Sequence, residues 1–92
     1  MKPAMADYHI TVKASVEKDI LKIPADITAR IFEHLEALST DPFPQDSWKL
    51  TGAEHLYRVR IGDYRIIYEV ILEDKEITII YIRHRSSANR NL

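Results

Sequence analysis

The sequence predicts an α+β fold in the order β-α-α-β-β-β, a small and mostly antiparallel sheet with a helical hairpin packed on one face. Residues 7–13 and 56–85 alternate apolar and polar side chains with the two-residue period of a strand. Residues 25–38 instead carry apolar side chains at the spacing of one helix face. Two amphipathic helices can cover only one side of such a sheet, so its other side is expected to lack a cover.

The first strand is predicted over residues 7–13, where apolar and polar side chains alternate cleanly. A short helix follows, with Ser15 as its N-cap, and buries Val16 and Ile20. Pro24 separates it from the next helix, because proline is well placed at the beginning of a helix. The N-terminus, residues 1–6, lacks the apolar core of a signal peptide and is expected to be a loose lead.

The second helix is predicted over residues 25–38. One apolar stripe, widened by Phe32, runs along it and consists of Ile27, Ile31, Leu35 and Leu38. The chain then enters a long connection, residues 41–55. Trp48 in this connection is expected to anchor the loop to the core, as a tryptophan beside a leucine more often does. Stacking of its ring on a nucleobase is the alternative. Lys49 either extends a basic face or is simply solvated.

A β-hairpin is predicted around Gly62-Asp63, a two-residue turn with glycine first, which is typical of type II′. This turn places Arg60 opposite Arg65 on the partner strand. The apolar face of the hairpin consists of Tyr57, Val59, Ile61, Tyr64, Ile66, Tyr68, Val70 and Leu72. The other face consists of Leu56, Arg58, Arg60, Arg65, Ile67, Glu69 and Ile71.

The last strand follows an acidic turn at residues 73–76, and a slip of one residue there would exchange its two faces. An even loop places Ile77, Ile79 and Tyr81 on the apolar face. The cationic face then receives Thr78, Ile80, Ile82 and His84. Arg85 lies at the strand end, and residues 86–92 form a polar tail.

The uncovered face combines cations with apolar side chains. Arg60 and Arg65 lie opposite each other and repel each other, which weakens the sheet. A fold tolerates such a cost in stability most readily at a functional site. Three converging cations, with Arg58 as the third, predict an anionic ligand, although solvated surface arginines are the simpler alternative. An apolar patch on an open face also predicts a protein partner, and the residues concerned are Leu56, Ile67, Ile71, Ile80 and Ile82.

Length and composition indicate one domain over residues 1–92, and the absence of cysteine fits a reducing cytoplasm. The net charge is −1, but residues 1–55 hold 6 Lys and Arg against 9 Asp and Glu, whereas residues 56–92 hold 7 against 5. This asymmetry predicts docking at one place and not general affinity for nucleic acid. No apolar run has the length of a membrane span, and the four scattered histidines predict neither a metal site nor another cofactor.

The segment from Leu50 to Val70, with its core R-I-G-D-Y-R-I-I-Y, followed by I-T-I-I-Y-I-R-H-R, resembles toxins of the RelE/ParE superfamily. The resemblance covers nearly the whole chain and implies a compact fold like that of small microbial ribonucleases. It implies a cytoplasmic toxin of a type II toxin–antitoxin system, RelE-like, that cleaves mRNA in the ribosomal decoding site. It also implies a cognate antitoxin that wraps the toxin over the apolar residues of the open face and carries any binding of the complex to operator DNA.

The same resemblance assigns the site. The basic pair before the turn falls on Arg58 and Arg60, the arginine after it on Arg65, and the arginine ending the last strand on Arg85. Apart from the resemblance, the basic residues Lys49 and Arg83 are expected to contact RNA. The tail tyrosine that RelE-like enzymes often carry has no counterpart in residues 86–92.

The missing tyrosine leaves the acid–base role open. Guanidinium groups bind phosphate but are poor general bases, because they keep their charge at any ordinary pH. His84 is the nearest candidate, since histidine titrates near neutrality, and a structural or solvated His84 is the alternative. A toxin that inhibits DNA gyrase without cleaving RNA, a weakened enzyme, and a binding module that only keeps the fold remain competing interpretations.

Overall fold

The computed structural model describes residues 7–86, and over them the predicted order of elements is confirmed with one short strand added. The elements are β1 (His9–Val12), α1 (Ala14–Ile20), α2 (Ala25–Thr40), β2 (Trp48–Lys49), β3 (Leu56–Ile61), β4 (Tyr64–Ile71) and β5 (Glu76–His84). The added strand, β2, lies in the segment expected to be an irregular connection. The predicted loose lead, residues 1–6, and residues 87–92 of the predicted tail lie outside the described residues.

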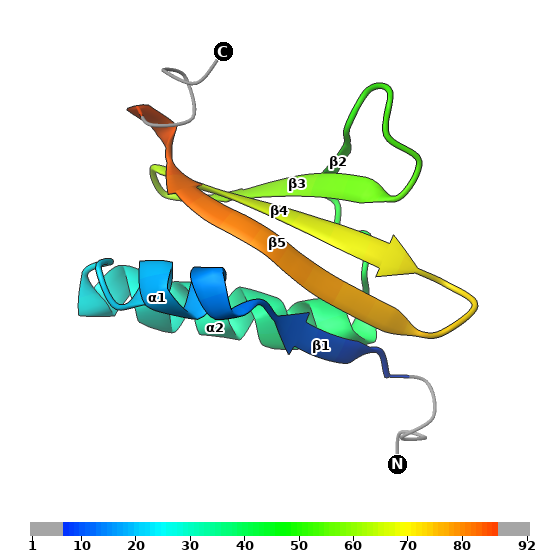
Figure 1. Ribbon diagram of the computed structural model, residues 1–92, viewed down its shortest axis with the longest axis horizontal. Helices are drawn as coiled ribbons and strands as arrows, with labels where there is room; N and C mark the ends of the chain where they lie inside the picture. Colours follow the sequence, from blue (N-terminus) through cyan, green and yellow to red (C-terminus); the bar gives the residue numbers. More distant parts are fainter. Residues whose placement is uncertain (1–6, 87–92) are drawn as a thin grey trace.

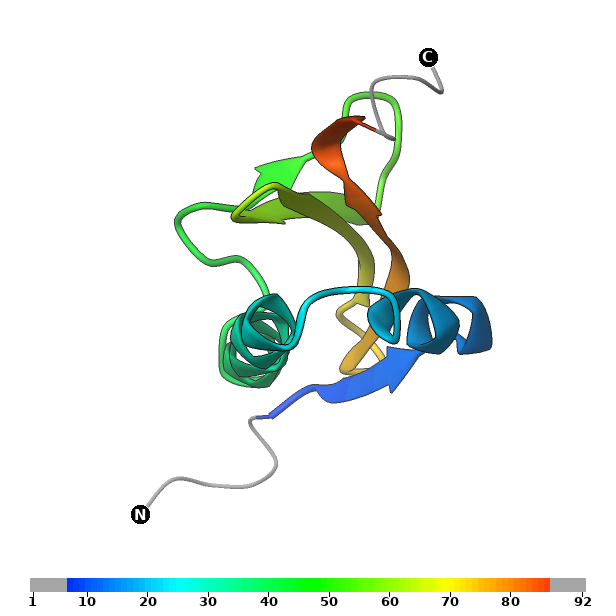
Figure 2. The same ribbon diagram turned by 90° about the vertical axis from the view of Figure 1, so that its left-hand side faces the viewer.

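The five strands form one sheet in the order β1-β5-β4-β3-β2. β1 is parallel to β5, and the other neighbours are antiparallel. Both helices lie on one side of β3, β4 and β5, as two amphipathic helices were expected to do (Figure 1). The sheet curls from β1 at one edge to β2 at the other (Figure 2). The face of β3–β5 turned away from the helices therefore carries no helix among the described residues.

The apolar stripes of the two helices pack against the sheet and form the helical side of the core. Val16 and Ile20 of α1 are buried as predicted, and so are most positions of the α2 stripe. Two details differ. The first helix begins at Ala14 without a side-chain cap, so Ser15 is not its N-cap. Phe32, expected to widen the stripe, is 52% exposed.

Among the helices of residues 7–86, none combines the length and the hydropathy of a membrane-spanning segment.

The hairpin between β3 and β4 has the predicted register. Arg60 pairs with Arg65 and Val59 with Ile66 across a two-residue turn. Gly62 has a φ of +58°, the left-handed region that a glycine enters without steric cost, as a type II′ turn requires. Turn chemistry and alternation agree here, which is why the sequence alone predicted the register.

The last strand departs from the prediction at a β-bulge. β4 pairs Ile67 with Tyr81 but Tyr68 with Ile79, so Ile80 is an extra residue on β5. A bulge of this kind reverses the alternation beyond it. Ile77 and Ile79 face the helices as predicted, but Tyr81 lies on the open face and Ile82 in the core, 3% exposed. The predicted faces of Tyr81, Ile82 and His84 are therefore wrong, although the predicted even loop is right.

Tyr68 closes the core beneath the segment that follows α2. Its ring is fully buried, and its hydroxyl donates a hydrogen bond of 2.9 Å to the carbonyl oxygen of Pro42. Burial raises the pKa of the Tyr68 phenol from 10.0 to about 12, because the charged phenolate loses its solvation. The fold thus favours the neutral phenol.

Tyr68→Phe is expected to change how stability depends on alkaline pH. The wild-type advantage from neutral Tyr68 is fully present below pH 10.0 and is lost as the pH rises towards about 12. The wild-type protein therefore loses roughly 2–3 kcal/mol of folding free energy over this range, which corresponds to two pKa units. Tyr68→Phe has no phenol to ionise and does not lose this free energy. Urea unfolding at several alkaline pH values, with Tyr8→Phe as the matched control, measures the difference. Equal pH slopes in wild type and Tyr68→Phe would contradict it.

Candidate functional site

Three arginines form a row across the three long strands. Arg60 on β3 pairs with Arg65 on β4, and Arg65 pairs in turn with Arg83 on β5. Directly paired residues project from the same face of a sheet, and Arg58, two residues before Arg60, projects from that face as well. We call Arg58, Arg60, Arg65 and Arg83 the arginine face.

No salt bridge among the described residues neutralises the arginine face, although Asp46 borders Arg58 and Arg60. Arg65, at the centre of the row, is half-buried, and its Nε atom is buried without a hydrogen-bond partner. Repulsion between neighbours and an unsatisfied buried donor both cost free energy. An anion bound on the exposed guanidinium atoms would offset the repulsion.

Aromatic rings flank these cations on both sides. The Arg58 guanidinium lies 6.0 Å from the ring centroid of Trp48, its pairing partner on β2, and the Arg83 guanidinium lies 4.2 Å from that of Tyr81. Trp48 is 65% exposed, so the expectation that it anchors the loop to the core is wrong. A hollow of about 310 Å³ beside the ring and the cations is lined by Asp46, Trp48, Arg58 and Arg60.

His84 does not join the arginine face. The bulge places it opposite Tyr64, on the side of the helices, with the two rings in edge contact at 5.2 Å. Its Nδ1 lies 2.9 Å from the hydroxyl of Ser86, and it lines a hollow together with Asp19 and Lys22. The prediction that His84 shares the cationic face is therefore wrong.

Arg85 lies at the strand end, as predicted, beside the tip of the β3–β4 hairpin. Its backbone N–H donates a hydrogen bond of 2.7 Å to the carbonyl oxygen of Asp63, and its guanidinium lies 3.8 Å from the Asp63 carboxylate. Arg85 is thus partly neutralised, unlike the members of the arginine face. A strong external anion would have to compete with Asp63 for it.

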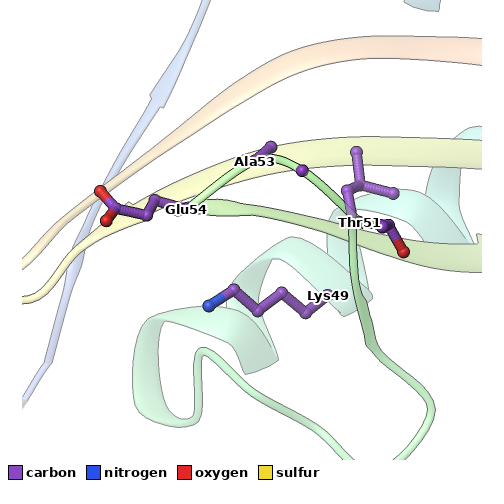
Figure 3. A pocket seen from close by; sticks show the side chains of 6 residues that line it. Lys49, Thr51, Ala53 and Glu54 are labelled. Atoms are coloured by element: carbon purple, nitrogen blue, oxygen red, sulfur yellow. The ribbon is translucent and has the colours of Figure 1, made fainter.

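Lys49 lies apart from the arginines. It pairs with Tyr57, which packs against the core, whereas the preceding residue Trp48 pairs with Arg58 on the open face. Lys49 lines a shallow hollow of about 450 Å³ with the loop at residues 50–54. Figure 3 shows its side chain extending past that loop. The predicted extension of the basic face by Lys49 is not found in this arrangement.

The five apolar residues predicted to meet a protein partner do not form one exposed patch. Ile82 belongs to the core, and Ile67 is only 2% exposed, between Arg58 and Tyr81 of the neighbouring strands. The other three, Leu56, Ile71 and Ile80, are half-buried. An apolar partner would therefore contact a smaller surface than the sequence predicted.

The arrangement is suited to holding a phosphate chain beside a planar ring. Guanidinium groups bind phosphate through paired N–H donors and keep their charge at any ordinary pH. Asp46 and Tyr81, which border the arginine face, are the titratable side chains that the sequence did not single out. Only the bulge and β2 bring them there, and neither feature has a signal in the residue pattern.

Comparison with known proteins gives one family and two relatives of similar sequence. A model of the "ParE toxin of type II toxin-antitoxin system, parDE" matches residues 10–89. The putative toxin RelE1 of Methanocaldococcus jannaschii is 32% identical over 87 residues, which cover 91% of this chain and 97% of the relative. Toxin RelE of Mycobacterium tuberculosis is 29% identical over 84 residues, 90% of this chain and 87% of the relative.

A solved structure has the same fold. In the crystal structure of the archaeal RelE–RelB complex from Pyrococcus horikoshii OT3, one chain superposes with a TM-score of 0.79 at 34% sequence identity. The match covers 86% of this chain and 96% of that chain. The fold and the order of its elements are therefore shared along almost the full length of that protein.

Proposed function

Because this chain belongs to the ParE toxin family of type II toxin–antitoxin systems, and is a RelE-type toxin, we propose that it cleaves mRNA on the ribosome as a metal-independent endoribonuclease. The observation that carries the proposal is the row of arginines across β3, β4 and β5, which form no ion pair within residues 7–86. Their charge and their common face support a phosphate chain as the ligand. With mRNA on the ribosome as the substrate, the reaction would take place in the cytoplasm.

The arginines would act on the charge that develops during cleavage. The RNA 2′-oxygen loses its proton and attacks the neighbouring phosphorus, which adds negative charge to the phosphate oxygens. The P–O5′ bond then breaks, leaving a 2′,3′-cyclic phosphate and a 5′-oxygen that takes up a proton. Fixed guanidinium groups stabilise that charge without a proton transfer of their own. We assign this role to Arg58, Arg60 and Arg65, and an RNA contact to Arg83. Arg85 would join them only by exchanging Asp63 for phosphate.

Proton transfer is a separate requirement, and His84 is poorly placed for it. We propose that catalysis rests mainly on positioning and charge stabilisation, with the ribosome supplying further groups. His84→Ala is then expected to leave both the single-turnover cleavage rate and its pH profile unchanged, since the ring faces Tyr64 and Ser86. A slower reaction, or the loss of an inflection near neutral pH, would return His84 to the mechanism.

We also propose a cognate antitoxin as the partner. The archaeal relative at 34% identity was solved as a complex of RelE with RelB, which supports a bound antitoxin for this chain. The half-buried residues Leu56, Ile71 and Ile80 are the apolar contacts that the open face still offers. Any binding of the complex to operator DNA would proceed through the antitoxin.

Primer extension on mRNA from cells that briefly express this chain tests the proposed activity. We expect new 5′ ends inside translated regions and none in the same transcripts carrying a mutated start codon, because cleavage requires translation. Arrested growth with SOS induction but without cuts would contradict nuclease activity and indicate inhibition of DNA gyrase. If neither cuts nor arrested growth is observed, only the fold and the antitoxin contact remain of the proposal.

A further inference from the structure

Within residues 7–86, the exposed indole of Trp48 lies over the Arg58 guanidinium and takes no part in the core. Other large apolar side chains are exposed too, among them Leu21, Phe32 and Leu72, but they do not lie beside the arginine face. Trp48 stands on β2, a strand of only two residues at the sheet edge. A large ring held open to solvent on an edge strand loses the burial that normally stabilises a tryptophan.

Its position relative to the arginines is fixed by backbone pairing. Trp48 pairs with Arg58, and the Arg58 guanidinium lies 6.0 Å from the ring centroid. Arg60, the next member of the arginine face along β3, lines the same hollow of about 310 Å³. One flat apolar surface and two cations thus border a single open space.

We propose that Trp48 is a stacking platform for one nucleobase of the RNA strand whose phosphates lie on Arg58 and Arg60. This assignment rests on the proposed function, because it supplies a base-binding subsite for the same substrate. Single-stranded nucleic acids bind where a cationic groove follows the backbone and an aromatic ring accepts a base. The Trp48 hollow has both parts within one pair of strands.

The surroundings favour RNA over an apolar segment of a protein. The ring is bordered by two arginines and Asp46, not by other exposed apolar side chains, so it is not the centre of an apolar patch. The Arg58 guanidinium can hold a phosphate while the indole holds the adjoining base. Because every base has a flat face, Trp48 would strengthen binding without reading the sequence.

Intrinsic fluorescence provides the first test, because Trp48 is the one tryptophan of the chain. The probe is a short single-stranded 2′-O-methyl RNA, which cannot be cut, and its counterpart with abasic sites. We expect the intact probe to quench the emission of the wild-type protein, and the abasic probe to bind through its phosphates without quenching. Quenching by the antitoxin and not by the intact RNA would overturn the proposal.

Single-turnover cleavage on programmed ribosomes provides the second test. Trp48→Ala is expected to raise the half-saturating toxin concentration by roughly 5- to 150-fold, the range of one lost base stack, and to leave the saturated rate unchanged. Trp48→Phe should restore most of the affinity, since a smaller ring still stacks. Leu72→Ala, which removes another exposed apolar side chain, is the matched control and should behave like wild type.

The outcomes separate the two proposals. If wild type cleaves mRNA and Trp48→Ala has the same half-saturating concentration, the stacking platform is wrong and the nuclease proposal stands. If wild type neither cleaves mRNA nor shows quenching by the intact probe, both are wrong. Because the Trp48 ring is mostly exposed, thermal unfolding of Trp48→Ala should match that of wild type, so weaker binding cannot be attributed to a lost core contact.

Discussion

Replacing Arg65 with alanine is expected to lower the saturated rate of mRNA cleavage by roughly 10²- to 10³-fold, the usual effect of removing one preorganised charge-stabilising donor. Arg65 lies on the central strand of the row, between Arg60 and Arg83. It is half-buried, so its charge is screened less by water than that of an exposed arginine. Growth inhibition by the variant should be lost accordingly.

The fold should survive this change. Alanine removes a cation that repels its two paired neighbours, as well as a buried Nε atom that lacks a partner. Thermal unfolding and single-turnover cleavage on programmed ribosomes measure the effects on stability and on the rate separately.

Lys18→Ala removes an exposed cation from α1 and is the control for a change of net charge. Arg65→Lys, which keeps the charge without the paired donors, should recover only part of the rate. Full toxicity of Arg65→Ala would contradict the assigned role.

Replacing Ile82 with alanine is expected to destabilise the protein by about 2–5 kcal/mol, the cost of truncating a buried isoleucine. Ile82 pairs with Ile66 on β4 and belongs to the core cluster, with 3% of its surface exposed. A loss of this size is a large part of the roughly 5–15 kcal/mol by which domains of this kind are stable. Equilibrium unfolding in urea measures it.

Ile80→Ala is the matched control, because it makes the same substitution at the extra residue of the bulge. Ile80 is half-buried, and its truncation should cost clearly less than that of Ile82. Without the bulge, strict alternation from Ile79 would place Ile80 and Ile82 on the same open face, and both variants would be nearly neutral. Equal, small effects of the two substitutions would therefore show that β5 has no bulge.

Most of the fold could be predicted because its signals are local. The apolar stripe of α2 and the turn at Gly62-Asp63 each depend on residues close in sequence. The predicted register of β3 and β4 placed Arg58, Arg60 and Arg65 on one face, which is where they lie. This part of the candidate site followed directly from two-residue alternation.

The rest of the site depends on features without a local signal. A bulge at Ile80 moves Tyr81 and Arg83 to the open face and His84 away from it, and no glycine or other distinctive residue marks the place. The pairing of Trp48 with Arg58 creates β2 within a segment that shows no strand pattern of its own. These two features decide which aromatic rings border the arginines.

By itself, the sequence determined the element order, the helix-facing side of the first hairpin and the concentration of cations on the other side. Each of these follows from periodicity and turn chemistry, which act between near neighbours in the chain. Only the tertiary structure decided the register of β5 beyond Ile79 and the exposure of Trp48. Core packing sets the register of β5, because Ile82 and not Tyr81 is buried in the core. Strand pairing sets the exposure of Trp48, because two residues pair with the edge of β3 as β2.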